Sequence, residues 1–314
     1  MAVSDLSLAE KAALLSGEST WESRSLPSRS IAPMVLADGP HGVRRQLGSS
    51  DHLGINASEP ATCFPTAATV ANSFDTALAE RIGAAAGAEA SALKVNVLLG
   101  PALNIKRSPL CGRNFEYFSE DPLVSGLFAA AYVRGIQSEG VAACPKHFAV
   151  NSQERRRMSS DSVVDERTLR EIYLTGFEIA VRDAAPRTIM SSYNKVNGTY
   201  AHENGHLLTT ILRDEWGFDG AVVSDWGGSN DAAAAAVAGG SLEMPSPGYD
   251  SAIQLVAKVE AGELDESVLD ARAQEILALG EWTAAHAPAT VDHDAHHALA
   301  REAAEQSAVL LKND

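Results

Sequence analysis

The feature that most constrains this chain is a repeated alternation between two kinds of segment. Short apolar runs rich in β-branched residues alternate with longer segments that have helical periodicity. The apolar runs are predicted strands at residues 34–37, 95–99, 142–144, 188–191, 221–224 and 241–244. The helical segments lie at residues 75–93, 122–138, 165–183, 207–216, 230–238 and 249–260. This order predicts a parallel sheet with helices outside it, because parallel strands need long crossover connections.

Capping residues support the predicted helix limits. An aspartate at the N-cap accepts hydrogen bonds from the first free N–H groups of a helix, and a glycine just past the last turn adopts the left-handed conformation easily. The aspartates at such positions are Asp75, Asp121 and Asp165. The glycines are Gly140, Gly217 and Gly262.

Polar residues follow the predicted strands. They are Asp38, Asn104, Arg107, Lys146, His147, Tyr193, Asn194, Asp225 and Glu243. In a (β/α)₈ barrel the carboxyl ends of all strands meet at one mouth, whereas an open doubly wound sheet usually carries a glycine-rich phosphate turn after its first strand. The sequence has no GxGxxG turn. We therefore expect an α/β fold of the TIM-like (β/α)₈ type, irregular or incomplete near its start, where residues 49–60 form a predicted long loop.

The sequence texture changes near residue 281. The stretch at residues 282–297 is rich in alanine, histidine and aspartate and poor in apolar periodicity, which is typical of an interdomain linker. A predicted helix at 298–304 and the apolar run SAVLLKND follow it. We expect a catalytic barrel domain at 1–281, the linker at 282–297, and the start of a truncated second α/β domain at 298–314.

Charge and composition exclude several classes of partner. The formal net charge is −16 and the basic residues form no long run, so binding to nucleic acid or to anionic lipid is not expected. No segment approaches the roughly 20 continuous apolar residues of a membrane helix, so we expect a soluble protein. The first 15 residues have neither a basic region nor a long apolar stretch of the signal-peptide kind, which favours the cytoplasm. Cys63, Cys111 and Cys144 are an odd number at irregular spacing, as expected of free thiols in a reducing compartment.

Asp225 is the strongest candidate for chemistry. It follows the apolar run AVVS and precedes Trp226, so a carboxylate and a large flat ring share one strand end. A carboxylate can attack an anomeric carbon or stabilise an oxocarbenium-like transition state, and an aromatic face packs against a sugar ring. The alternative is that Asp225 only caps the following helix, and the spacing favours neither reading.

Other rim residues have competing interpretations. Lys146 and His147 suit bidentate recognition of sugar hydroxyls, although Lys146 alone suits a Schiff-base lysine. Asp38, in the DGPHGVR turn, faces the mouth or forms a simple Asx-turn. Tyr193 has two interpretations. Its hydroxyl donates a hydrogen bond to a nucleophilic carboxylate, or it is a core tyrosine whose hydroxyl bonds another group. The loop around Arg113 is dense in charge and can form a solvated ion-pair network.

Two charged clusters outside the strand ends are expected to be solvated. Glu154 precedes three consecutive arginines, at 155–157, of which one can point inward. The histidines of the linker-like stretch have no metal-binding spacing, so we expect solvent exposure and neither a metal nor a cofactor. These histidines are His286, His293, His296 and His297.

Several long ungapped segments resemble the N-terminal barrel domain of family 3 glycoside hydrolases of the β-glucosidase type. They are LADGPHGVR, NIKRSPLCGRNFEYFSEDP, KHFAVNSQERRR, IMSSYNKVNG, GFDGAVVSDWGG and EQSAVLLKND. The segment KHFAVNS differs from the KHFPGHG-like pattern of the branch that hydrolyses N-acetylglucosaminides. The resemblance implies hydrolysis of terminal β-D-glucosyl residues by double displacement, with Asp225 as nucleophile. It also implies a glycone pocket built from Asp38, Arg113, Lys146, His147, Tyr193 and Trp226.

Retaining hydrolysis needs two carboxyl groups, and the sequence offers one with strong support. The resemblance implies that the general acid comes from a second domain, while Glu243 is a weak candidate within this chain. We therefore expect a β-glycosidase whose acid lies elsewhere. The alternatives are a catalytically silent carbohydrate-binding barrel and a Schiff-base lyase that uses Lys146.

Overall fold

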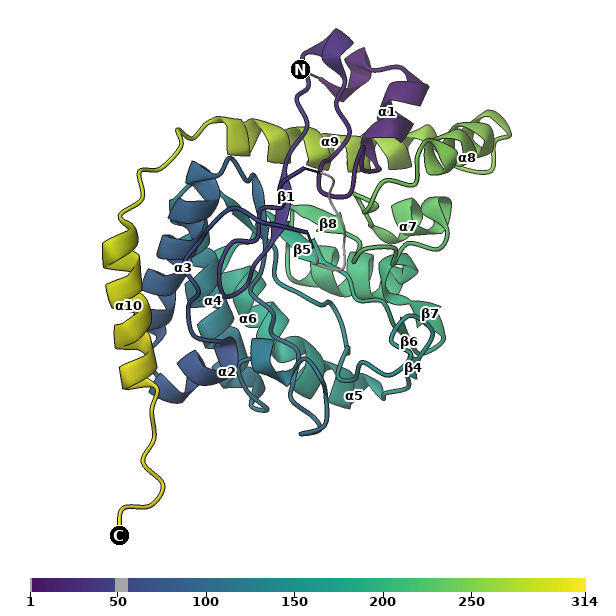
Figure 1. Ribbon diagram of the computed structural model, residues 1–314. Helices are drawn as coiled ribbons and strands as arrows, with labels where there is room; N and C mark the ends of the chain where they lie inside the picture. The colour runs from purple at the N-terminus through teal and green to yellow at the C-terminus, as the bar shows by residue number, and fades with distance from the viewer. Residues whose placement is uncertain (1, 49–55) are drawn as a thin grey trace.

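The protein is described by a computed structural model that covers residues 2–48 and 56–314 (Figure 1). The predicted loop at 49–60 falls partly on residues 49–55, which lie outside the described residues. Helices surround a small number of short strands, so the predicted α/β class is confirmed. None of the helices in the described part is long and apolar enough to cross a membrane.

Within residues 2–48 and 56–314 the strands are shorter than the sequence predicts and form three sheets. The first holds β1 (Leu36–Asp38), β2 (Val97–Leu99) and β3 (Ala142–Ala143), and the second holds β5 (Thr188–Met190) and β8 (Ala221–Val223), all parallel. Prolines separated by one residue from the ends of β2 and β3 limit their extension, because Pro101 and Pro145 have no N–H to donate. The third sheet holds β4 (Asp161–Ser162), β6 (Lys195–Val196) and β7 (Thr199–Tyr200).

Isolated hydrogen-bonded pairs connect the first two sheets and extend them. Phe148 pairs with Ser191 in parallel, between the segments of β3 and β5. The predicted strand at 241–244 forms only single parallel pairs, because Leu242 pairs with Val223 and Glu243 pairs with Ser16. The N–H of Leu36 in β1 donates to Trp21 O at 2.8 Å, so the segment before β1 lies beside that strand.

The strands of the first two sheets are buried on both faces. Alternate residues of β1, β2, β3, β5 and β8 belong to two different apolar clusters, as the two-residue period of a strand requires. One cluster lies between the strands and contains Leu36, Val97, Leu99, Ala142, Met190 and Val223. The other joins the strands to the helices and contains Ala37, Leu98, Ala143, Ile189 and Val222. Burial on both faces explains why these strands are continuous apolar runs in the sequence.

Helix α4 (Pro122–Ser138) packs against α3 (Thr76–Ala92) on one side and α6 (Thr175–Ala184) on the other (Figure 1). Gly135 lets α3 and α4 approach closely, because a Cβ there would overlap the carbonyl oxygen of Glu80. The predicted N-caps are confirmed, since the side chains of Asp75, Asp121 and Asp165 accept N–H groups of the helices that follow.

The predicted helix at 165–183 has an irregular middle. It consists of α5 (Glu166–Thr168), a π-helical segment (Leu169–Leu174) and α6, and a second π-helical segment spans His206–Glu215. The remaining α-helices are α1 (Leu8–Leu14), α2 (Ala67–Val70), α7 (Ala232–Ala238), α8 (Asp250–Glu260), α9 (Glu266–Ala284) and α10 (His293–Gln306). Short 3₁₀ turns lie at Val3–Asp5, Pro27–Arg29, Ala71–Ser73, Asn114–Glu116 and Ala201–Glu203.

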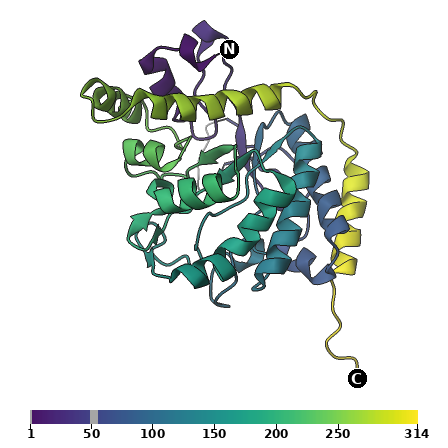
Figure 2. The same cartoon turned by 180° about the vertical axis from the view of Figure 1, so that it is seen from behind.

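The C-terminal elements differ from the predicted ones. Helix α9 crosses one end of the molecule, and α10 lies along its side next to α3, as both views show (Figures 1 and 2). Helix α9 continues to Ala284 and α10 begins at His293, so much of the predicted linker is helical. Residues 308–314 form no strand, because nothing in the described part pairs with them, and Leu311 is 92% exposed. The division into domains stays a prediction.

Candidate active site

Asp225 lies just after β8 and is only 8% exposed. Its two carboxylate oxygens differ. Oδ1 accepts the Trp226 N–H at 2.8 Å, while Oδ2 is buried, has no hydrogen-bond partner, and lies 3.7 Å from His147 Nε2. The Gly228 N–H donates to Asp225 O at 2.8 Å and closes the turn after the strand. One oxygen is therefore held in place and the other is free to react.

Burial dominates the electrostatics of Asp225. It raises the pKa of the carboxyl group above its ordinary value, because a charge is costly in a poorly solvated site. The cations of Arg113, Lys146 and Arg157 and the Trp226 N–H oppose this rise. The surroundings therefore keep an anion at this position while leaving it weakly solvated, which suits a nucleophile.

Asp38 and Lys146 form an ion pair at the mouth of the strands. Lys146 Nζ donates to Asp38 Oδ1 at 2.7 Å, and the lysine side chain is 4% exposed against 45% for the aspartate. Burial raises the pKa of Asp38, but the Lys146 cation outweighs it and the net shift is downward. Burial likewise lowers the pKa of Lys146, but Asp38 and Glu116 outweigh it and the net shift is upward. Both groups stay charged, and a Schiff base needs a neutral amine, so the pair disfavours the lyase alternative.

His147 is almost fully buried, with 1% exposure, and is held by Asn104. Asn104 Oδ1 accepts the His147 N–H at 2.8 Å, and Asn104 Nδ2 donates to His147 O at 2.8 Å. Burial, together with the cations of Arg113 and Lys146, lowers the pKa of His147 well below its ordinary value. The imidazole is therefore neutral at physiological pH.

Arg113 forms an ion pair with Glu116 one turn further along the chain. Glu116 is 3% exposed, and Arg113 adds positive charge near Asp225 and Asp38. Burial alone would lower the pKa of Arg113, but Glu116 reverses the shift. The loop after β2 thus contains an ion pair, as predicted. This pair is largely buried and lies next to Asp225 rather than in solvent.

Tyr193 lies beside Asp225, and its hydroxyl donates to Trp226 O at 3.0 Å. The hydroxyl also interacts with the Asp225 side chain, so the predicted contact is present beside this bond to the backbone carbonyl. Burial first, and then the Asp225 charge, raise the pKa of the phenol. The Arg157 guanidinium lies over the Tyr193 ring, 4.6 Å from its centroid, so one arginine of the 155–157 cluster points inward as expected.

Trp226 forms an aromatic wall together with Trp21. The two ring centroids lie 4.9 Å apart, and Trp226 Nε1 donates to Thr20 O at 2.7 Å. The segment beside β1 therefore holds the indole in place. A fixed aromatic face next to a carboxylate is well suited to the apolar face of a sugar ring.

The comparisons with known proteins agree with this geometry. Residues 30–279 match the glycosyl hydrolase family 3 N terminal domain. The chain belongs to this family. The resemblance seen in the sequence motifs is confirmed.

Relatives in family 3 cover the whole chain. Thermostable beta-glucosidase B of Acetivibrio thermocellus is 50% identical over 314 residues, which are 99% of this chain and 42% of that protein. An exo-alpha-(1->6)-L-arabinopyranosidase of Bifidobacterium longum is 46% identical over 99% of this chain and 42% of its own length. The chain thus spans less than half the length of these relatives.

Solved family 3 structures have the same fold. The Bifidobacterium adolescentis GH3 beta-glucosidase superposes with a TM-score of 0.93 at 43% identity, covering 100% of this chain and 45% of that one. The beta-glucosidase 3B of Thermotoga neapolitana, in complex with glycerol, has a TM-score of 0.93 at 39% identity, covering 99% and 47%.

The structure brings all the predicted site residues of the family 3 motifs together. Direct contacts link Asp38 with Lys146, His147 with Asp225, and Tyr193 with Trp226, while the charge of Arg113 acts on Asp225. Their individual roles stay predictions. Sequence reasoning missed four further residues at this site. Trp21 packs on Trp226, and Glu116 pairs with Arg113. The Tyr117 ring centroid lies 6.3 Å from that of His147, and the charges of Asp38 and Lys146 act on His41. Of these, Glu116 and Tyr117 lie within the quoted GRNFEYFSEDP segment, and His41 within DGPHGVR. Trp21 lies in no motif, so no sequence signal identifies it.

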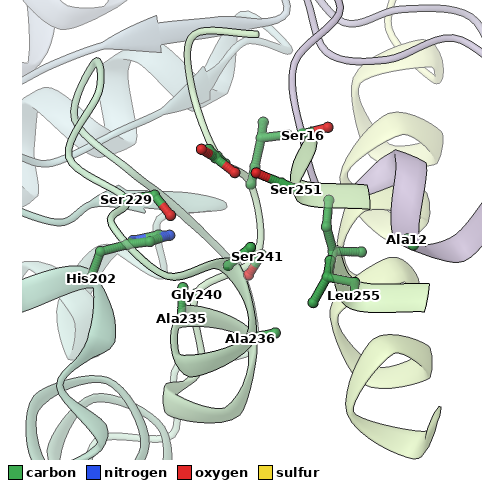
Figure 3. Close-up of a pocket in the computed structure, with 14 residues that line it drawn as sticks. Ala12, Ser16, His202, Ser229, Ala235, Ala236, Gly240, Ser241, Ser251 and Leu255 are labelled. Carbon is green, nitrogen blue, oxygen red and sulfur yellow. The ribbon is translucent and has the colours of Figure 1, made fainter. Parts of the chain in front are cut away.

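Glu243 lines a pocket that does not include Asp225. This pocket is lined by Ser16, His202, Ser241 and Ser251, among others, and by none of the predicted site residues (Figure 3). Burial raises the pKa of Glu243, with a hydrogen bond to the Ser251 hydroxyl opposing it. The position of Glu243 therefore does not support it as the general acid.

The histidines near the C-terminus do not form a metal site. No group of three or more potential metal ligands occurs in the described part of the chain. The expected exposure of His296 is wrong, because its Nδ1 lies 2.7 Å from the buried carboxylate of Glu89 on α3. This contact attaches α10 to the helical layer. His293 and His297 are exposed, as expected.

Proposed function

We propose that this chain is the nucleophile-bearing domain of a retaining β-glucosidase that removes terminal non-reducing β-D-glucosyl residues. The observation that carries the proposal is the free, buried Oδ2 of Asp225 beside an aromatic wall. Its neighbours carry donors and acceptors rather than an excess of one charge, because Lys146 and Arg113 each have a carboxylate partner. A neutral, hydroxyl-rich ligand fits such a site better than an anion does.

In the proposed mechanism Asp225 Oδ2 attacks the anomeric carbon while the bond to the aglycone oxygen breaks. The product of this step is a glycosyl ester on Asp225, and water then attacks the anomeric carbon to release the sugar with its configuration retained. Asp38, Arg113, Lys146 and His147 orient the hydroxyls. The Trp226 N–H on Oδ1 keeps the attacking oxygen aimed at the sugar.

The general acid of the proposed reaction lies beyond this chain. Retaining hydrolysis uses a second carboxyl group about 5–5.5 Å from the nucleophile, and the neighbouring carboxylates Asp38 and Glu116 are already paired with Lys146 and Arg113. The relatives named as glucosidases are more than twice as long as the match, which leaves room for a further domain. A substrate whose leaving group needs no protonation would bypass this requirement.

We also propose that the strands form an irregular TIM-like barrel. The parallel pairs run from β1 through β2 and β3 to β5, β8 and the segment at 241–244. The circuit closes where the Gly17 N–H donates to Glu243 O at 2.9 Å and the Ser23 N–H donates to Met34 O at 2.9 Å. A closed circuit of this kind explains how residues from every strand end reach one mouth.

The free cysteines support our proposal of a reducing compartment such as the cytoplasm. Cys63, Cys111 and Cys144 are all unpaired. Cys144 is fully buried, and burial raises the pKa of its thiol to about 12, so it is an inert core residue.

The proposed function is tested by trapping the covalent intermediate. A 2-deoxy-2-fluoro-β-glucoside with a good leaving group is incubated with the chain, and the mass is compared with that of Asp225→Ala. We expect a stoichiometric adduct that maps to Asp225 and is absent from the variant. An adduct on another residue would contradict the assignment. Binding of glucose with no adduct would favour the silent carbohydrate-binding barrel.

A further inference from the structure

The orientation of the Asn104 side chain is fixed by two backbone hydrogen bonds. Its Oδ1 accepts the His147 N–H and its Nδ2 donates to His147 O, each at 2.8 Å. Exchanging the amide oxygen and nitrogen would place a donor against the N–H and an acceptor against the carbonyl. Asn104 is 3% exposed, so water cannot compensate for such an exchange. The oxygen therefore has to face His147.

The same Asn104 oxygen determines which nitrogen of the His147 ring carries the proton. Oδ1 lies 3.2 Å from His147 Nδ1, and a carbonyl oxygen can only accept. Nδ1 must therefore be the donor, and in a neutral ring Nε2 is then unprotonated. Burial and the surrounding cations together disfavour a second proton on the ring.

The charged and titratable groups around the ring come from every neighbouring segment. Lys146 precedes it, Arg113 and the ring of Tyr117 come from the loop after β2, Arg157 follows β3, and Asp225 follows β8. The three cations disfavour an imidazolium and only Asp225 favours one. A neutral ring with one defined lone pair is the result.

We propose that Asn104 is a positioning residue that locks His147 as the Nδ1–H tautomer, so that Nε2 accepts a hydrogen bond from a substrate hydroxyl. The part of this inference that concerns a sugar rests on the proposed function. The tautomer itself does not.

The lock has a consequence for Asp225. His147 Nε2 lies 3.7 Å from Asp225 Oδ2. If Nε2 carried a proton, a small shift of the ring would let it donate a charge-assisted hydrogen bond to that oxygen. Such a bond would lower the reactivity of the attacking oxygen. With the lone pair on Nε2, Oδ2 keeps no partner, as the structure shows. The Nδ1–H tautomer thus leaves Asp225 Oδ2 without a hydrogen bond from His147. It also means that Nε2 can only accept a hydrogen bond, so the ligand hydroxyl has to be the donor.

The tautomer is measured directly by NMR on the full chain with ¹⁵N-labelled histidine. The nine histidines are resolved by a His147→Gln variant, whose missing signals assign the ring nitrogens of His147. We expect the Nε2 of His147 in the wild type to resonate as an unprotonated nitrogen and Nδ1 as a protonated one. A protonated Nε2, or a rapidly exchanging average, would overturn the proposal. This readout needs no turnover, so it stands or fails separately from the glycosidase function.

Asn104→Leu tests whether the asparagine is the cause. We expect Nε2 to become at least partly protonated in this variant. The matched control is Asn194→Leu. Asn194 is also buried and donates to Ala149 O in the same segment at 3.2 Å, but it forms no hydrogen bond with the His147 ring. The control should leave the His147 signals unchanged. An unchanged tautomer in Asn104→Leu would overturn the role of Asn104.

Binding of deoxyglucoses gives the functional readout. For each singly deoxygenated glucose the loss of affinity relative to glucose is measured in the wild type and in both variants. One position, the one whose hydroxyl donates to Nε2, should lose about 10-fold or more in the wild type and markedly less in Asn104→Leu. Asn194→Leu should keep the wild-type pattern. Equal patterns in all three proteins would overturn the inferred hydroxyl contact.

Discussion

Asp225 is a buried carboxylate and Glu243 is a half-buried one at a neighbouring strand end, and their surroundings differ sharply. Their segments are adjacent, because Val223 pairs with Leu242 in parallel. Burial is the largest cause of a raised pKa in both. Around Asp225 three cations oppose this rise, whereas around Glu243 only a serine hydroxyl does. Burial at a strand end is therefore not sufficient for a nucleophile, and the neighbours decide which carboxylate remains an available anion.

The largest expected difference between the two carboxylates is in the formation of the glycosyl adduct. Asp225→Asn should lower its rate by at least about 1,000-fold, because the amide is not a nucleophile of comparable strength. Glu243→Gln should stay within about twofold of the wild type, since separate sites usually act independently. Both are measured by mass spectrometry with a fluorinated glucoside. Equal losses in the two variants would remove the distinction between the sites.

The cations around Asp225 offer a second way to test the comparison. Lys146→Ala should lower kcat/KM for adduct formation about 10- to 100-fold, because it leaves Asp38 unpaired and removes a donor. Lys11 is a matched control, since it is similarly buried and paired with Glu266 and Asp270 far from the site. Lys11→Ala should lower the melting temperature while leaving this rate unchanged. A similar fall in rate for Lys11→Ala would show a general effect of lost stability.

The pH dependence of adduct formation should report on Asp225 alone. The reacting form is the anion, so the rate should fall as the pH drops through the pKa of Asp225. The midpoint should lie above the ordinary aspartate value of 3.8, because the pKa is raised. Glu243→Gln serves as the control and should leave the midpoint where it is. A midpoint below 3.8 would mean that the cations outweigh burial.

The smallest expected effect is on stability at Glu243. A carboxyl group whose pKa is raised on folding stabilises the protein when protonated, and this contribution is lost as the pH rises through the folded pKa. The ordinary value of 4.5 is raised here, so the charged form is disfavoured at neutral pH. Glu243→Gln should therefore raise the melting temperature by about 1–2 °C at pH 7 and change it little at pH 4. A lower melting temperature at pH 7 would show that the charged Glu243 has a stabilising partner.

Much of the local structure could be predicted from the sequence. The period of the apolar runs placed β1, β2, β3, β5 and β8 to within a few residues, and α4 spans the predicted residues 122–138. The short lengths of the strands were not predicted, since pairing requires N–H groups that Pro101 and Pro145 lack. The two π-helical segments were also missed, because their spacing of apolar residues is close to that of an α-helix.

By itself, the sequence determined the order of most strands and helices and which polar residues stand at the strand ends, because these features depend on neighbouring residues. Helix α9 was not predicted, and the predicted strand at 241–244 forms only single pairs. Only the tertiary structure decided which of those residues interact. Lys146 pairs with Asp38 across 108 positions, and Trp226 contacts Trp21 from an unrelated segment. Coulombic energies and burial depend on distances in space rather than on separation along the chain. The free oxygen of Asp225 and the orientation of Asn104 follow from such distances, and no local pattern contains them.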